Sequence, residues 1–316
     1  MTYPLHQRPH SVSPPRLRRP AVLPTGLADL RDLPDTEFLA LWDTILVEDA
    51  IKDQLLAQAI FNFTVRPRVS RASLPLHGII LLTGEPGTGK TSLSKGLAAR
   101  TAEALGNIGA FRFLDVDPHV LTSGSLGKSQ RAVTELFGTI AEYAAQGPIV
   151  VLLDEVETIL ADRAKLSLEA NPVDVHRATD AALVQLDRLA AEQPNLLFVA
   201  TSNFPQAIDA AFVSRTDLVL TVPPPNEAGC LAILRSTLEG MARAFPALGA
   251  VAHSPQLRGV AKACDGLDGR TVRKLVGAAC TLSKDTALDP GRLTAAALLR
   301  AAELAASETV RAGARR

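Results

Sequence analysis

Apolar positions along the chain follow two patterns, short and mainly apolar runs and longer stretches with helical spacing. Short, mainly apolar runs predict five strands, at 79–83, 110–116, 149–153, 196–202 and 218–222, of which 149–153 has no polar residue. Helical spacing predicts four helices before and between these strands, at 51–63, 90–105, 130–145 and 178–191. Strands that alternate with helices in this way form a mainly parallel sheet covered on both faces. The pattern therefore predicts the α/β class.

The alternation ends at three consecutive prolines, 223–225, which interrupt regular structure. Beyond them the apolar spacing is only helical, at 227–245, 256–264, 269–285 and 293–311. At the other end, residues 1–24 are rich in proline and arginine, and an ordered pattern begins only at about residue 35. We therefore expect a mobile tail over 1–34, an α/β domain over 35–225 and a small all-helical domain over 226–316.

Residues 84–91 read Gly-Glu-Pro-Gly-Thr-Gly-Lys-Thr and directly follow the run at 79–83. This is the full spacing of a phosphate-binding loop, whose glycines admit close approach and whose following helix points N–H groups at phosphate. Lys90 would reach the β- and γ-phosphates of ATP, and the Thr91 hydroxyl would ligate Mg²⁺. An ordinary glycine turn is the alternative, although it does not require the whole pattern. The predicted ATP-binding residues here are Gly84, Glu85, Pro86, Gly87, Thr88, Gly89, Lys90, Thr91 and Ser92.

Polar residues follow two of the predicted strands. Asp154 and Glu155 come directly after the run at 149–153. In an enzyme with a phosphate-binding loop, Asp154 would hold Mg²⁺ and Glu155 would deprotonate or orient the attacking water. The alternative is a buried structural pair of carboxylates. Asn203 follows the run at 196–202, and its amide would bond the attacking water or the γ-phosphate; its alternative is an ordinary turn residue.

Two arginines are candidates for stabilising charge on the γ-phosphate. Arg215 ends the segment Ala-Phe-Val-Ser-Arg and would act as an arginine finger on the ATP of a neighbouring subunit. Its alternative is a surface ion pair with Asp217. Arg270 begins a predicted helix of the C-terminal domain and would contact phosphate from that side, with Arg273 as the competing candidate.

Charge and cysteine content limit the classes of function. The 316 residues include 33 basic and 33 acidic side chains, so a neutral chain argues against a broad nucleic-acid-binding surface. No uncharged apolar run has the length of a membrane span and no signal peptide is evident, so we expect a cytoplasmic protein. Cys230, Cys264 and Cys280 are odd in number and far apart, which predicts buried thiols.

Together these segments resemble the AAA+ ATPases, and in particular the pachytene-checkpoint ATPase family. The resemblance extends from residue 41 to about residue 282. It is carried by the phosphate-binding loop, by the runs at 41–52, 152–157 and 171–177, and by the segments that end in Arg215 and Arg270. It implies a P-loop domain with a helical lid, and a homohexameric ring with ATP at each subunit boundary. Segment 43–51 matches the region that packs on adenine, which implies base contacts from Ile45 and Ile51.

The same resemblance implies a protein substrate. The family draws a terminal segment of a HORMA-domain protein into the ring's pore and opens that protein. Its first pore loop usually presents an aromatic residue, whereas the matching stretch 121–130 has none; Gly124, Ser125 and Leu126 are the candidate contacts. A folded N-terminal adaptor-binding domain, present in eukaryotic relatives, is also not matched. The chain thus resembles the bacterial version in CBASS anti-phage operons, which would separate a HORMA protein from a CD-NTase-type nucleotide-second-messenger synthase.

Two other functions stay open at this point. The arginines of the tail would suit an AAA+ protein that works on nucleic acid, such as a helper in transposition or replication. A ring that binds ATP without turnover would instead be a nucleotide-gated scaffold. The acidic pair and the two arginines favour an ATPase over the scaffold.

Overall fold

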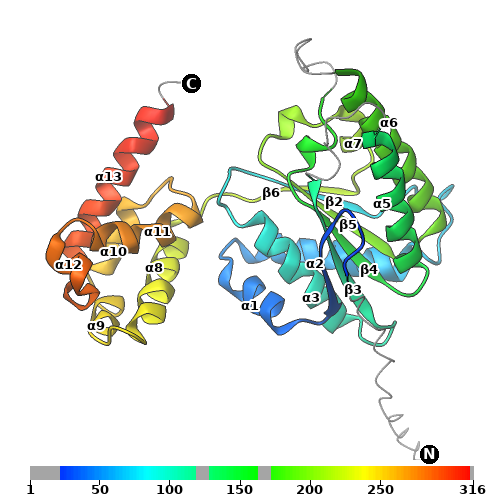
Figure 1. The fold of residues 1–316 in the computed structure, drawn as a ribbon. Coiled ribbons are helices and arrows are strands. Elements are labelled where there is room, and N and C mark those ends of the chain that lie inside the picture. Colours follow the sequence, from blue (N-terminus) through cyan, green and yellow to red (C-terminus); the bar gives the residue numbers. More distant parts are fainter. Residues whose placement is uncertain (1–21, 119–127, 163–171, 314–316) are drawn as a thin grey trace, which may run out of the picture.

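The computed structural model describes residues 22–118, 128–162 and 172–313. These residues form a sheet-containing domain and a separate group of helices, joined by the segment that follows the last strand (Figure 1). The predicted pore-loop contacts Gly124, Ser125 and Leu126 lie outside the described residues, as do positions 1–21 of the predicted tail.

The sheet of the described residues has six strands in the order β1-β3-β4-β5-β2-β6. Their bounds are β1 Leu27–Leu33, β2 Ile79–Thr83, β3 Phe111–Val116, β4 Ile149–Leu153, β5 Leu196–Ser202 and β6 Leu218–Thr221. All neighbouring pairs from β3 to β6 are parallel, and β1 pairs antiparallel with β3 at the edge. The predicted, mainly parallel α/β sheet is confirmed.

Strand β1 corrects the expected limit of the tail, because the ordered chain begins well before residue 35. Its buried residues are Leu27, Leu30 and Leu33, a spacing of three that does not alternate. A register shift between Leu27 and Asp29 accounts for the first interval. Leu30 and Leu33 then face the two opposite sides of the sheet, so the strand lacks the period of two that identifies a half-buried strand.

Helices cover both faces of the sheet (Figure 1). One face packs against α1 Thr36–Thr44, α2 Asp49–Val65 and α3 Lys90–Ala104, and the other against α5 Lys128–Ala144 and α6 Pro172–Glu192. In β2, Ile79 and Leu81 join the α5–α6 core, whereas Ile80 and Leu82 join the α1–α3 core. Both sides of the strand are therefore buried, which explains its uninterrupted apolar run.

The C-terminal helices have a core of their own. They are α8 Glu227–Ala242, α9 Leu248–Ala252, α10 Leu257–Ala263, α11 Gly269–Cys280, α12 Lys284–Leu288 and α13 Ala295–Gly313. The single helix expected at 269–285 is wrong, since Ser283 caps a new helix by accepting from the Thr286 N–H. The three cysteines are buried free thiols, as predicted. Within the described residues, none of the helices combines the length and apolarity needed to span a bilayer.

Candidate functional site

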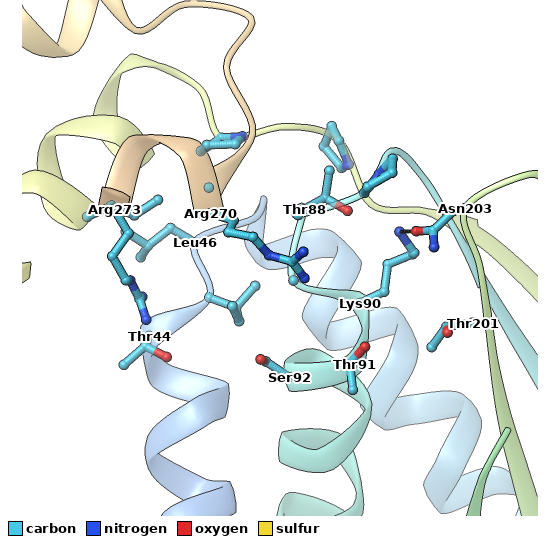
Figure 2. Close-up of a pocket in the computed structure, with 18 of the residues that line it drawn as sticks. Thr44, Leu46, Thr88, Lys90, Thr91, Ser92, Thr201, Asn203, Arg270 and Arg273 are labelled. Carbon is cyan, nitrogen blue, oxygen red and sulfur yellow. Dashed lines mark hydrogen bonds between the residues drawn. The ribbon is translucent and has the colours of Figure 1, made fainter. Parts of the chain in front are cut away.

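A cavity of about 430 Å³ opens at the carboxyl ends of β2, β4 and β5, between the sheet domain and the helical domain (Figure 2). Parallel strands present their carboxyl ends at one edge of a sheet, which is where ligands bind in such folds. The predicted site residues that line the cavity are Ile45, Pro86, Gly87, Thr88, Gly89, Lys90, Thr91, Ser92, Asp154, Glu155, Asn203 and Arg270. Residues more than 200 positions apart in the sequence thus line one cavity.

The glycine-rich loop between β2 and α3 requires glycine for close approach to two different segments. Gly84 has a φ of 146°, and a Cβ there would lie 2.4 Å from the carbonyl oxygen of Val222. Gly87 has a φ of 84°, and a Cβ there would lie 1.9 Å from Oδ1 of Asp268 in the helical domain. The loop therefore lies directly under the helical domain, and its conformation depends on residues without side chains.

Lys90 places its ammonium at the centre of this loop. Its Nζ donates to the carbonyl oxygens of Gly84 and Glu85 and to Oδ1 of Asn203, each at 2.8 Å. Gly84 and Glu85 thus face Lys90 through their carbonyls. Burial lowers the pKa of Lys90, while the nearby carboxylates, with Asp154 first, act in the opposite direction. The ammonium is held where a phosphate entering the loop would meet it.

Beside Lys90, hydroxyl and carboxylate oxygens form a group that suits Mg²⁺. The Thr91 hydroxyl donates to Asp154 at 3.0 Å from Oδ1 and 3.1 Å from Oδ2, and the Thr201 hydroxyl also donates to Oδ1. Hard oxygen donors of this kind are the ligands that Mg²⁺ prefers, and it usually takes one or two carboxylates together with substrate phosphates. The described residues contain no cluster of three or more metal-ligating side chains of the kind that binds a metal without such phosphates. The predicted pair, Thr91 and Asp154, fits Mg²⁺.

Glu155 and Asn203 meet at the rim of the cavity. The Asn203 amide nitrogen donates to Oε1 of Glu155 at 3.2 Å, while its oxygen accepts from Lys90. Glu155 has a φ of 50°, the one positive value for a residue other than glycine in the described chain. Backbone in this region is costly for a side chain that is not glycine, and it is found most often at functional sites. The geometry suits a base beside a water-orienting amide.

The other end of the cavity is mostly apolar. Its wall is formed by residues of the segment after α1, of the proline segment after β6 and of α8: Thr44, Ile45, Leu46, Pro223, Pro225 and Ile233. An apolar wall beside a phosphate loop suits a nucleobase. Ile51, the second predicted base contact, is not among the lining residues; it packs from α2 against the core of α1–α3.

The helical domain supplies the basic side of the cavity from α11. Asp268 caps this helix by accepting from the N–H groups of Arg270 at 2.9 Å and Thr271 at 3.0 Å. Figure 2 shows Arg270 extending toward Thr88 and Lys90 of the loop, whereas Arg273 extends toward Thr44. Of the two candidates, Arg270 is therefore the one directed at the phosphate side.

Arg215 does not line the cavity of its own chain. It forms a two-pronged pair with Asp187 of α6, with Nε at 2.8 Å from Oδ1 and Nη2 at 2.7 Å from Oδ2. The alternative pairing with Asp217 is wrong, because the Asp217 carboxylate accepts from the backbone N–H groups of His77, Gly78 and Ile79. A position outside its own cavity is what an arginine acting on a neighbouring subunit requires.

Three of the polar residues that the sequence did not predict contact the predicted site residues. Thr201 donates to Asp154, Glu157 accepts from the Asn203 backbone at 3.0 Å, and Asp268 meets Gly87. Two of them carried a visible signal, since Thr201 interrupts an apolar strand and Glu157 follows the acidic pair by two positions. At Asp268 the sequence indicates only a helix N-cap, and a capping residue does not reveal which other segment it contacts.

Comparison with known proteins identifies the architecture. The family described as "ATPase family associated with various cellular activities (AAA)" matches residues 80–224. The chain is 58% identical over 275 residues to CD-NTase-associated protein 6 of Pseudomonas aeruginosa, covering 87% of this chain and 90% of that protein. It is 35% identical to the pachytene checkpoint protein 2 homolog of Danio rerio, covering 67% of this chain but only 51% of that protein, so it spans about half of that relative's length.

Solved structures agree with these sequence matches. Caenorhabditis elegans PCH-2 has a TM-score of 0.70 at 26% identity, covering 89% of this chain and 75% of that one. A chain of the HORMA:CdnC:Trip13 complex of E. coli MS115-1 has a TM-score of 0.69, covering 87% of this chain and 94% of that one. Its identity is 17%, so this match shows the shared fold alone.

The cavity with its phosphate-binding loop, the parallel sheet and the helical lid are therefore the parts of a nucleotide-binding ATPase. The chain belongs to the AAA ATPase family, in the branch that contains CD-NTase-associated protein 6 and the pachytene checkpoint protein 2 homologues.

Proposed function

We propose that this chain hydrolyses ATP in a ring of identical subunits and uses the cycle to open a HORMA-domain protein, separating it from a CD-NTase-type nucleotide synthase. The observation that carries the proposal is the 58% identity to a CD-NTase-associated protein along 90% of that protein's length. A similar fold is present in a complex named for HORMA, CdnC and Trip13, which supports the class of partner. Release of the synthase from HORMA would restrain anti-phage signalling.

Six polar residues of the cavity have a defined task in this proposal. Lys90 neutralises the β- and γ-phosphates of the substrate ATP, and Arg270 reaches the phosphates from the lid. Glu155 accepts a proton from the attacking water, and Asn203 orients that water through its amide. Thr91 and Asp154 hold Mg²⁺, which neutralises charge on the phosphate oxygens when bound. The contact between Asn203 and both Lys90 and Glu155 supports a site arranged for turnover over a scaffold that only binds.

The proposal includes a contribution from a neighbouring subunit. Arg215 would stabilise charge on the γ-phosphate bound next door, an effect that supplies about 10³–10⁵ in rate in related enzymes. To do so it has to leave Asp187, its partner within the chain. A hexameric ring, the assembly implied by the family resemblance, would bring six such arginines to six cavities.

The nucleic-acid alternative has no support from the described chain. It rested on arginines in residues 1–24, and the four of them at positions 8, 16, 18 and 19 lie outside the described residues. The formal net charge of zero also gives no general attraction for a polyanion. We therefore retain only the proposal of a HORMA-domain substrate.

A trapping experiment tests the proposal. The variant Glu155→Gln, tagged and incubated with ATP in extract of its native host, should bind ATP, fail to hydrolyse it and retain a HORMA-domain protein. The matched control is Lys90→Ala, which should retain none because it lacks the phosphate contact. Recovery of the same proteins with both variants, or of no HORMA-domain protein with Glu155→Gln, would contradict the proposed substrate.

A further inference from the structure

The carboxylate of Glu157 connects the ends of two strands at the ATPase site. Glu157 lies in the short 3₁₀ turn Val156–Thr158 that follows β4, and its Oε1 accepts from the backbone N–H of Asn203 at 3.0 Å. The buried side chain of Val156 anchors the turn in the core. The left-handed backbone at Glu155 turns the chain at the end of β4, so that the residue two positions later reaches back toward β5.

Asn203 needs such a partner because it lies one residue beyond the sheet. The last paired residues of β5 are Ser202, opposite Thr83 of β2, and Ala200, opposite Leu153 of β4. The ladder therefore does not hold the Asn203 N–H, and an unfixed backbone there would leave the side-chain amide free to shift. The Glu157 Oε1 accepts from this N–H at 3.0 Å, which anchors the Asn203 backbone.

The geometry of Glu157 includes a feature that packing does not explain. Its second oxygen, Oε2, is buried and has no hydrogen-bond partner among the described residues. An unpaired buried oxygen costs free energy, and such groups in folded proteins call for an explanation. The cost is offset at the first oxygen, which holds the Asn203 backbone while Lys90 and Glu155 hold the Asn203 amide.

We propose that Glu157 is a positioning residue of the ATPase: by fixing the Asn203 backbone it places the Asn203 amide between Lys90 and Glu155. The inference rests on the proposed hydrolysis at this cavity and names a further residue on which it depends. Outer partners of metal ligands typically contribute about 10-fold to 100-fold to activity, and we expect an effect of similar size for Glu157 acting through Asn203. Glu157→Ala should therefore lower kcat by about 10-fold or more while the Kd for ATP stays within about threefold.

The conservative variant separates positioning from charge and from general stability. Glu157→Gln keeps an oxygen that can accept from the Asn203 N–H, so its kcat should stay within about threefold of the parent. Glu157→Asp keeps the charge but is one methylene too short to make the contact, so it should behave like Glu157→Ala. Thermal melting of each full-length variant records folding, and Glu157→Asp carries the comparison if Glu157→Ala does not fold.

A double-mutant cycle tests whether Glu157 acts through Asn203. If it does, Glu157→Ala combined with Asn203→Ala should be no slower than Asn203→Ala alone, because the anchored amide is already absent. Multiplicative losses would overturn the inference, as would a parental kcat in Glu157→Ala or equal losses in the Gln and Ala variants. A parent that does not hydrolyse ATP, or a Glu155→Gln variant that does, would overturn the proposed function itself and this inference with it.

Discussion

The contact between the phosphate-binding loop and the lid makes a quantitative prediction about Gly87. Alanine at this position would need a left-handed backbone, since Gly87 has a φ of 84°, and its Cβ would lie 1.9 Å from Oδ1 of Asp268. The backbone cost is about 1–2 kcal/mol. Displacing Asp268 also removes the cap of α11, which is worth about 1 kcal/mol. Gly87→Ala should therefore destabilise the protein by about 2–3 kcal/mol.

The assay is urea unfolding of the full chain together with ATP titration. Gly277→Ala is the matched control, because Gly277 lies in α11, the helix that Asp268 caps, and has open space where a Cβ would stand. Alanine there should stabilise the protein by about 0.5–1 kcal/mol. ATP affinity should fall in Gly87→Ala, since a displaced α11 carries Arg270 away from the loop. Replacing Asp268 by alanine in the Gly87→Ala background should cost little more, because the Asp268 cap is already lost there. A Gly87→Ala variant as stable as the parent, or losses that simply add, would refute the contact.

Further predictions concern Arg215, its partner and the thiols. Arg215→Ala should lower the rate of ATP hydrolysis by about 10³-fold or more at unchanged ATP affinity. Mixing this variant with Lys90→Ala should restore activity in mixed rings. No recovery in confirmed mixed rings would refute an arginine finger acting in trans. The Arg215 hydrogen bond lowers the pKa of Asp187, so Asp187→Asn should lower the free energy of unfolding by less than about 1 kcal/mol at pH 7. This loss of stability should disappear as pH falls through the depressed folded-state pKa of Asp187. An equal loss at pH 7 and pH 3 would contradict the pair. Burial raises the pKa of Cys230 to about 11 and of Cys264 to about 12, so neither should react with a thiol reagent at pH 8 until urea unfolds the chain.

Sequence patterns predicted the parts of the fold whose burial is uniform. The run at 196–202 became β5 with the same bounds, because both faces of a central parallel strand are covered. Strand β1 was missed because a register shift and burial on both faces removed its alternation. The break between α11 and α12 was missed because Ser283 caps the second helix inside a stretch that keeps helical spacing.

The site residues also divide into those that local motifs predicted and those whose contacts come from distant segments. Motifs located Lys90, Asp154 and Asn203, since each acts through its own side chain at a fixed position after a strand. Contacts between distant segments are not written in local spacing, so the Asp187 partner of Arg215 could not be predicted. Ile51 was expected in the base pocket from its segment, but the helical turn of α2 directs it to the core.

The most direct test of the proposed remodelling follows release of the synthase in real time. A HORMA-domain protein carrying a fluorescent label is bound to its nucleotide synthase, and the parent chain is added with ATP and Mg²⁺. We predict that fluorescence anisotropy falls at a rate proportional to ATP turnover, and that Glu155→Gln, which binds ATP without hydrolysing it, leaves the complex intact. Release that proceeds equally with Glu155→Gln, or a complex that persists while the parent hydrolyses ATP, would contradict it.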